Sequence, residues 1–435
     1  MRINNNLILF VASVFGFVLT IRAQSSYDFQ TVLHMGLNHS HQMKVSEADS
    51  IIRALEVKKA KLNYTPEVSV TGQTMLLNQP DIRLMGQPSS MAAPKNASLV
   101  MGSVGLPIFT GFQLKNNLAI SKEMQLAEAE NRVADSTTVT MQVIEAYLSL
   151  YKAQQAKELV EENVKVAEKR ISDFEKLVAN DIITENDLLK AKIQLSRLRS
   201  SQLEISAQNE LAAYQLSLLT GIPENISIEV NSSIFSQVPA IITQEEFDAI
   251  LLNRNDYKAM EHQVKASEYI VKMQQANYYP HVSLSGMYVS AYVPNTLTIN
   301  NMINAGVTLK YDLSALYKNG TSVQVKKNEL MRINAQLEQL SDRIKLETRK
   351  SFLDYQTAVS QEELHQEIVA QSEENYREIS KKFENQLVTP TDILEAETQK
   401  LQAQIDLKIA EAAKFQAYCN YLKNSGNLNQ LNMIK

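Results

Sequence analysis

Acidic residues recur at matching places in two similar segments of this 435-residue chain. In the later segment Asp392 and Glu395 are three residues apart, which places both carboxylates on one face of a helix. In the earlier segment Glu185 and Asp187 occupy the corresponding place. Clustered carboxylates can select or bind cations. An aspartate near the start of a helix can instead cap it and interact favourably with its dipole, so both interpretations stay open.

Other reactive groups do not form a recognisable site. No nucleophile is matched with a base and no glycine-rich phosphate loop occurs, so we expect no catalytic residue, no cofactor and no enzyme. His34, His39 and His41 form the only histidine cluster, and the spacing of His39 and His41 does not place both rings on one helix face, so no metal site is predicted. The single cysteine, Cys419, excludes an internal disulfide, and the net charge of -5 gives no sign of nucleic-acid binding.

The first 23 residues are predicted to be an export signal. Arg2 precedes an apolar run from Leu7 to Ile21, and the sequence Ile-Arg-Ala before Gln24 is an acceptable cleavage site. A retained anchor is the alternative, but the run is short for a transmembrane helix. Removal of residues 1–23 takes away Arg2 and Arg22 and no acid, so the net charge changes from -5 to -7.

The elements that carry the acidic residues occur twice. The sequence from Tyr64 to Gly72 recurs from Tyr278 to Gly286, and the sequence from Thr184 to Ala191 recurs from Thr389 to Ala396. A repeat of half the chain indicates one duplicated structural unit rather than a solenoid. We predict a first repeat over residues 24–220, a connector over 221–242, a second repeat over 243–425 and a tail over 426–435.

Each repeat contains two stretches with the alternation of a strand. We predict strands at about 66–78, 97–109, 280–293 and 299–312. In the last, apolar residues from Ile303 to Tyr311 alternate with polar ones from Asn304 to Asp312. Their length suits tilted strands that cross a bilayer, with lipid on one face and water on the other. Two half-buried hairpins of a soluble domain are the alternative.

Very long helices are predicted to flank these strands. Residues 27–62 have a helical pattern, and helical hairpins are expected at about 112–219 and 315–423, where glycine and proline are scarce. A helix of some 65 residues would be on the order of 100 Å long. The last helix has the spacing of a coiled-coil seam, formed by Leu394, Leu401, Ile405, Ile409 and Ala412.

Four membrane strands cannot close a barrel by themselves. Open strand edges in hydrocarbon leave backbone groups unpaired, at a cost of several kcal/mol each. The chain must therefore share its strands with copies of itself. Two copies would give eight strands, which enclose little beyond side chains, whereas three would give twelve strands and leave a lumen.

Several short motifs, in this order and duplication, resemble one known family. They are Lys61 to Gly72 with its repeat Ala276 to Gly286, Leu106 to Phe112, Leu218 to Pro223, and Tyr311 to Asn319, the last similar to a variant found in many Bacteroidota members. Over essentially its whole mature length the chain resembles TolC-like outer-membrane efflux channels.

This resemblance implies a fold class that is mainly α with a membrane β-barrel portion. Long antiparallel helical hairpins would form a periplasmic tunnel, and two internal repeats would supply four strands per chain to a trimeric twelve-stranded barrel. The implied function is the exit duct of a tripartite efflux or type I secretion system. The implied partners are two further copies in a homotrimer, outer-membrane lipid, a periplasmic adaptor, and an inner-membrane efflux pump or ABC transporter. A periplasmic adaptor or coiled-coil scaffold is the alternative function.

The resemblance also directs attention to the hairpin turns, where such tunnels narrow. The family usually has a glycine six residues before an aspartate, and this chain has Asp181 and Gln386 there. Asn180 and Asn385 come directly before, and we expect asparagine to preserve the turn because it tolerates left-handed backbone.

The polar residues that close the family's tunnel correspond to Phe383 and Val388, which cannot make the same links. Five acidic residues are expected near the narrowest point, namely Asp181, Glu185, Asp187, Asp392 and Glu395. Three aromatic residues are expected at the membrane interface, namely Phe109, Phe112 and Tyr311.

Overall fold

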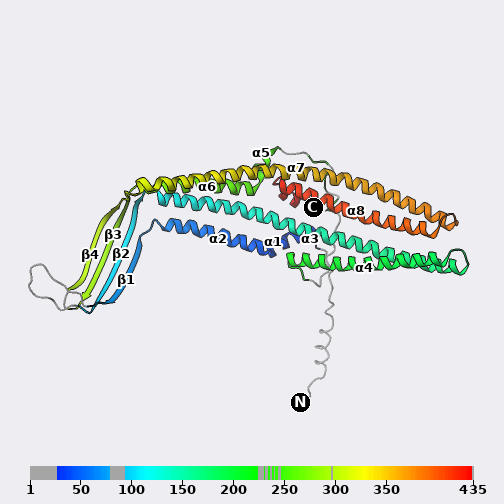
Figure 1. Cartoon of the computed structure of the whole chain (residues 1–435), viewed down its shortest axis with the longest axis horizontal. Helices are drawn as coiled ribbons and strands as arrows, with labels where there is room; N and C mark the ends of the chain where they lie inside the picture. The colour runs from blue at the N-terminus through cyan, green and yellow to red at the C-terminus, as the bar shows by residue number, and fades with distance from the viewer. Residues whose placement is uncertain are drawn as a thin grey trace, which may run out of the picture.

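The structure is a computed structural model that describes residues 27–78, 94–223, 230, 234–235, 238–239, 241–242, 246–294 and 297–433. The predicted signal peptide, residues 1–23, lies outside these ranges. The molecule is elongated, with a sheet at one end and long helices extending away from it (Figure 1).

The sheet has four antiparallel strands in the order β1-β2-β3-β4. Its strands are β1 (Glu67–Leu76), β2 (Asn96–Thr110), β3 (His281–Val293) and β4 (Leu297–Lys310). Pairing of β2 with β3 joins the two repeats into one sheet, with Val104 opposite Gly286. Strand β4 ends two residues before the predicted limit, because the Asp312 carboxylate accepts hydrogen bonds from the Ser314 backbone and hydroxyl and starts a turn.

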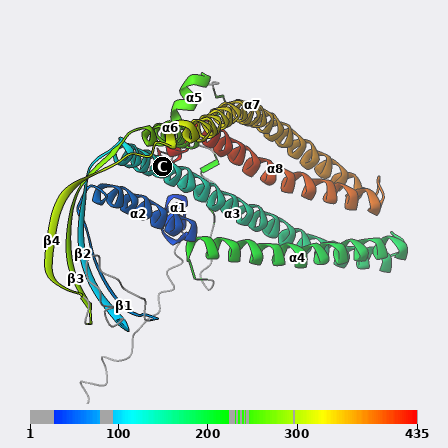
Figure 2. The same ribbon diagram turned by 60° about the vertical axis from the view of Figure 1, so that its left-hand side comes forward.

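Two long helical hairpins leave the sheet. The first consists of α3 (Gln113–Ala179) and α4 (Glu185–Thr220), and the second of α7 (Ala315–Glu384) and α8 (Pro390–Asn424). The outgoing helices α3 and α7 have 67 and 70 residues, which corresponds to about 100 Å each. Both hairpins turn at the same end of the molecule, far from the sheet (Figure 1 and Figure 2). The predicted fold class, mainly helical with four strands and two repeats, is confirmed.

Shorter helices pack beside the part of each hairpin that is nearer the sheet. They are α1 (Phe29–His39) and α2 (His41–Leu62) in the first repeat, and α5 (Phe247–Asn253), α6 (Asn255–Gln275) and the 3-10 turn η2 (Ala276–Tyr278) in the second. A last 3-10 segment, η3 (Leu428–Met433), follows α8. The single helix predicted for residues 27–62 is wrong, because Ser40 leaves helical geometry and its hydroxyl accepts a hydrogen bond from the Met43 backbone at 3.4 Å.

The main core lies midway along the molecule, where α1, α3, α4 and α8 meet the connector between repeats. Aromatic rings dominate it: Phe29 contacts Tyr147 and Phe415, and Phe235 contacts Tyr151 and Phe415. The predicted seam of α8 is only partly correct. Leu401 and Ala412 are buried, but Ile409 is 45% exposed because the helix turns this position away from the other helices.

The two faces of the sheet differ as the alternation predicts. On one face Val68 lies opposite Val104, and Leu284 lies opposite Val307. On the other face the Ser69 and Ser103 hydroxyls are 2.7 Å apart. The apolar side chains remain exposed, 76% for Val70 and 77% for Ile303. Within the described ranges, no other part of the chain covers the faces or the two edges of the sheet.

Candidate functional site at the hairpin tips

Both outgoing helices end in the same backbone motif. After α3 the Asp181 amide donates to the Val178 carbonyl and the Ile182 amide to the Leu177 carbonyl, at 3.0 and 2.9 Å. This pattern is a Schellman motif, which needs one residue with positive φ. That residue is Asp181, with φ of 56°. The tip of the second hairpin repeats the motif with Gln386, whose φ is 62°.

The expectation that asparagine supplies the left-handed residue is therefore wrong. Asn180 and Asn385 have φ of -105° and -91°. Their side-chain amides donate instead to the carbonyls of Lys176 and Lys381, at 2.7 and 2.8 Å. Carbonyls in the last turn of a helix are short of amide partners, so the asparagine side chains act as caps. The Lys381 carbonyl also accepts from the Asn385 backbone amide at 3.2 Å. At the two positions where the family usually has glycine, Asp181 and Gln386 adopt the positive φ that glycine adopts most easily.

The returning helices begin with matching threonine caps. The Thr184 hydroxyl accepts from the Asp187 amide at 3.2 Å, and the Thr389 hydroxyl from the Asp392 amide at 3.4 Å. The Asp392 carboxylate in turn accepts from the Thr389 backbone at 2.7 Å, which completes a capping box. Hydrogen bonds from the two threonines lower the pKa of Asp187 and of Asp392. Both aspartates thus cap their helices and are held in the charged form.

The other predicted acidic residues are exposed near the tips. Asp181 lies in the first turn, Glu185 begins α4, and Glu395 lies one turn into α8, where its carboxylate accepts from Gln399 at 3.3 Å. The sequence therefore identified five carboxylates that the structure gathers at one end of the molecule. Two of them have a capping role as well.

An apolar cluster behind the turns joins all four helices. Phe174 of α3, Leu188 and Ala191 of α4 and Ile393 of α8 are buried together. Phe383 of α7 packs against it, with its ring 5.6 Å from that of Phe174. Phe383 thus makes a packing contact rather than a polar link. Val388 lies half-buried in the second turn.

Next to this cluster an arginine joins the two hairpins. Arg170 of α3 donates from Nε to the Glu397 carboxylate of α8 at 3.1 Å, and from Nη2 to the Tyr376 hydroxyl of α7 at 3.2 Å. The side chains of Arg170 and Glu397 are 17% and 14% exposed. Burial favours loss of the charge on Arg170, but Glu397 and Tyr376 outweigh it and raise the pKa of the guanidinium. Sequence reasoning missed this contact, because no local pattern relates residues 227 positions apart.

The three aromatic residues predicted at the membrane interface, Phe109, Phe112 and Tyr311, lie at the ends of β2 and β4 next to the long helices. Phe112 has φ of 71° and its ring contacts those of Phe109 and Tyr279, at 5.4 and 5.9 Å between centroids. Gly111 before it also has positive φ, and a Cβ there would lie 2.5 Å from the Ala276 carbonyl oxygen. Phe112 and Tyr311 are 52% and 42% exposed. The side chains form a partly exposed aromatic group at the base of the sheet.

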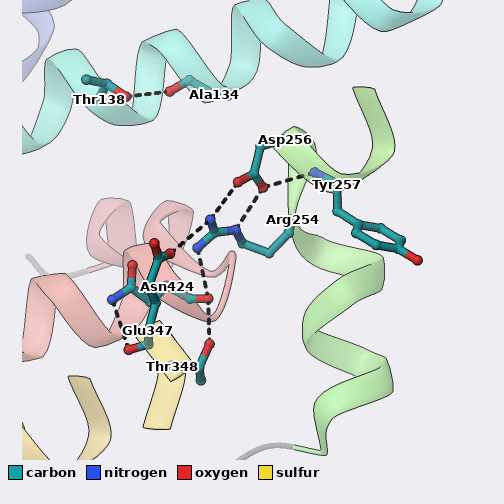
Figure 3. A network of polar contacts seen from close by, with 8 residues as sticks. All are labelled: Ala134, Thr138, Arg254, Asp256, Tyr257, Glu347, Thr348 and Asn424. Carbon is teal, nitrogen blue, oxygen red and sulfur yellow. Dashed lines mark hydrogen bonds and ion pairs between the residues drawn. The ribbon is translucent and has the colours of Figure 1, made fainter. Parts of the chain in front are cut away.

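A second polar network, also absent from the sequence reasoning, surrounds Arg254 (Figure 3). Arg254, between α5 and α6, donates to both carboxylate oxygens of Asp256 at 2.9 and 2.6 Å and to the Asn424 carbonyl at 3.2 Å. It also pairs with Glu347 of α7 at 3.6 Å. The network ties the start of α6 to α7 and to the end of α8, beside a cavity of about 210 Å³.

Within the described ranges no three His, Cys, Asp or Glu side chains are arranged to hold a metal ion. Among the described helices none has a segment both long and apolar enough to cross a membrane.

Solved structures with the same fold include outer-membrane channels. A membrane protein from Pseudomonas aeruginosa superposes with a TM-score of 0.80 at 15% identity, over 93% of each chain. The CmeC outer membrane channel of Campylobacter jejuni gives 0.77 at 15% identity, over 92% of this chain and 85% of that one. The relative BepC, an outer membrane efflux protein of Brucella suis, is 19% identical over 91% of this chain and 84% of its own length.

The architecture is that of a channel subunit, with a sheet at one end and paired hairpins that meet at capped tips. The chain belongs to the outer membrane efflux protein family, whose sequence model matches residues 32–222 and 247–420. The resemblance to TolC-like channels is thereby confirmed. The chain is an outer-membrane efflux channel with its helices in the periplasm, and it is not an enzyme.

Proposed function

We propose that three copies of the chain assemble into the exit duct of a tripartite export system. The observation that carries this proposal is the four-stranded sheet with two open edges, β1 and β4. Three such sheets supply twelve strands, enough to enclose a lumen. The exposed apolar face of Val68, Val104 and Val307 would contact lipid, and the serine face would line the lumen.

The hairpin tips would form the periplasmic end of the duct. In the proposed trimer the carboxylates of Asp187, Asp392 and Glu395 recur around one axis, which gives a ring of negative charge. The Arg170 contact with Glu397 and Tyr376 holds the two tips of each chain together. We assign to this contact the closure that Phe383 and Val388 cannot provide.

The tips also offer a surface for a periplasmic adaptor, which an inner-membrane pump or ABC transporter would join. Ile182 and Leu387 hold equivalent positions in the two turns and are 45% and 74% exposed. Exposed apolar side chains on such turns suit contact with another protein. Replacement of both by serine is expected to reduce co-purification of the adaptor from native membranes.

Reconstitution into planar bilayers tests the channel assignment. The detergent-extracted protein is expected to produce discrete conductance steps. A periplasmic adaptor or scaffold would produce none and would need no detergent. An adaptor would also have one hairpin flanked by small β domains, whereas this chain has two hairpins that share one sheet.

A further inference from the structure

All the methionines of the four described strands lie on the same face of the sheet. They are Met75 of β1, Met101 of β2, Met287 of β3 and Met302 of β4. Alternation along each strand and the register between strands place them on the face of the Ser69 hydroxyl. The opposite, apolar face uses valine, leucine and isoleucine and contains no methionine. The methionines therefore belong to the polar face.

These methionines are exposed among polar side chains. Met75, Met287 and Met302 have exposed fractions of 37, 37 and 42%. Their face also carries serine and threonine hydroxyls, and those of Ser285 and Thr308 are 3.1 Å apart. Methionine usually fills gaps in a buried core. Packing within the chain does not explain these side chains, which stay open to a ligand.

Three of the methionines surround one valine. Val289 of β3 pairs with Met101 of β2 on one side and with Met302 of β4 on the other. Met287 is two residues before Val289 on the same strand and shares its face. Diagonal neighbours of this kind are about 7 to 8 Å apart, within reach of long side chains. Val289 is 7% exposed and is the only buried residue of the four described strands. The three flexible thioethers can therefore converge above it.

Three converging thioethers form a soft and neutral set of ligands. Thioether and thiolate sulfur select Cu(I), whereas carboxylate, carbonyl and water oxygens suit hard divalent ions. The residues that pair directly with the three methionines carry no carboxylate, imidazole or thiol, namely Thr71, Ser103, Val289 and Asn304. A hard divalent cation would thus lack the oxygen ligands that it needs.

We propose that Met101, Met287 and Met302 form a binding site for a soft monovalent metal ion, Cu(I) or Ag(I). Met101 belongs to the first repeat and the other two to the second, so the site forms only where β2 pairs with β3. The site itself depends on the strand register of one chain. Its place in the lumen rests on the proposed function, in which the methionine face lines the duct.

Titration with Ag(I) tests the site, because this ion does not oxidise in air as Cu(I) does. Silver nitrate is added to the full chain in detergent, in a chloride-free buffer, and binding is followed by calorimetry. The test variant combines Met101→Leu, Met287→Leu and Met302→Leu, since leucine keeps the volume and apolar character and removes the sulfur. We expect wild type to bind one Ag(I) ion per chain that this variant does not bind.

The matched control is Met75→Leu. Met75 has the same face and the same exposed fraction as Met287. It lies four residues beyond Thr71, the partner of Met101, or about 13 Å away along the strand. Binding by this variant should equal that of wild type. The buried Cys419 is common to all variants and cancels in the comparison.

The pH dependence of binding identifies the type of ligand. A thioether has no proton to lose, so the affinity for Ag(I) should be the same at pH about 5 and about 8. Histidine or cysteine ligands would bind more weakly in acid, because protons compete with the metal. X-ray absorption of the silver-loaded wild type should show sulfur neighbours, and this measurement needs no variant.

The outcomes separate this site from the proposed duct. Equal binding by wild type and the triple variant, a marked loss in Met75→Leu, affinity that falls in acid, or nitrogen and oxygen neighbours would each overturn the site. Sulfur-bound Ag(I) on a protein that forms no conducting pore would support the site and contradict the duct. Conductance steps without this Ag(I) binding would support the duct and overturn the site.

Discussion

Arg170 of α3 and Glu397 of α8 form an ion pair between the two hairpins of one chain, with Nε 3.1 Å from Oε1. Both side chains are mostly buried, and Lys400 lies over the ring of their neighbour Tyr376 at 5.1 Å from its centroid. The contact is next to the apolar cluster that holds the tips. It is therefore well placed to control how far the tips separate.

Replacement of this arginine should loosen the tips. Arg170→Met leaves the Glu397 carboxylate buried without its partner, at a cost of about 2 to 4 kcal/mol. We expect faster hydrogen exchange in the last turns of α7 and the first turns of α8, and a larger conductance in planar bilayers.

The matched control is Arg199→Met, which removes an exposed pair with Glu168. Such pairs contribute about 0 to 1 kcal/mol, so little change is expected. Combining Arg170→Met with Glu397→Leu should recover most of the lost protection, because no unpaired charge remains. Equal exchange in wild type and Arg170→Met would contradict the assignment.

Glycine should stabilise the second tip. At Gln386 the backbone has φ of 62°, which is unfavourable for a residue with a Cβ. Gln386→Gly is expected to increase the free energy of unfolding by about 0.5 to 1 kcal/mol, measured by thermal denaturation. Asn385→Gly should do the reverse, since it removes the hydrogen bond to the Lys381 carbonyl.

The hairpin turns illustrate which features of the site could be predicted from the sequence. Both turns could be located, together with Asp181 and Gln386 at the positions where the family usually has glycine, because the internal repeat aligns them. Sequence reasoning assigned the left-handed conformation to asparagine on propensity alone. Propensity was overridden by hydrogen bonds from the asparagine side chains to the carbonyls of Lys176 and Lys381 in the last helical turns.

The charge at the tip should govern block by divalent cations. Asp392→Asn keeps an oxygen that can cap α8 but removes the negative charge, so block of the open pore by a divalent cation should weaken. Asp342→Asn is the control, because this carboxylate is 79% exposed on α7, well before its tip. Unchanged block in planar-bilayer recordings of Asp392→Asn would show that the aspartate only caps the helix.

The Arg254 network should lose stability in acid. Burial raises the pKa of Asp256, but hydrogen bonds and charge from Arg254 outweigh it and leave the pKa below its ordinary value of 3.8. The stabilisation is therefore complete above that ordinary value and is lost as the pH falls through the lowered pKa. Asp256→Asn should cost about 1 to 2 kcal/mol at pH about 7.

Thermal denaturation at pH about 7 and about 3 checks whether the contribution of Asp256 to stability falls in acid. The difference in free energy of unfolding between wild type and Asp256→Asn should be smaller at the lower pH. A difference that grows in acid would mean that the carboxylate is stabilised in its protonated form.

The sequence supported the architecture because alternation and the scarcity of glycine and proline are local signals. Strands β1 to β4 and helices α3 and α7 were predictable for this reason. The contacts between hairpins were not. Arg170 with Glu397, and Arg254 with Glu347, join residues far apart in the chain, and only the packing of helices brings them together. The break at Ser40 was missed because one capping serine scarcely alters the helical pattern.

The central claim is that one chain cannot seal its own sheet and completes it with two further copies. Native mass spectrometry of the protein extracted from outer membranes in detergent tests this directly. The account predicts a species of three times the chain mass that persists in detergent. A stable monomer that stays in solution without detergent would contradict it.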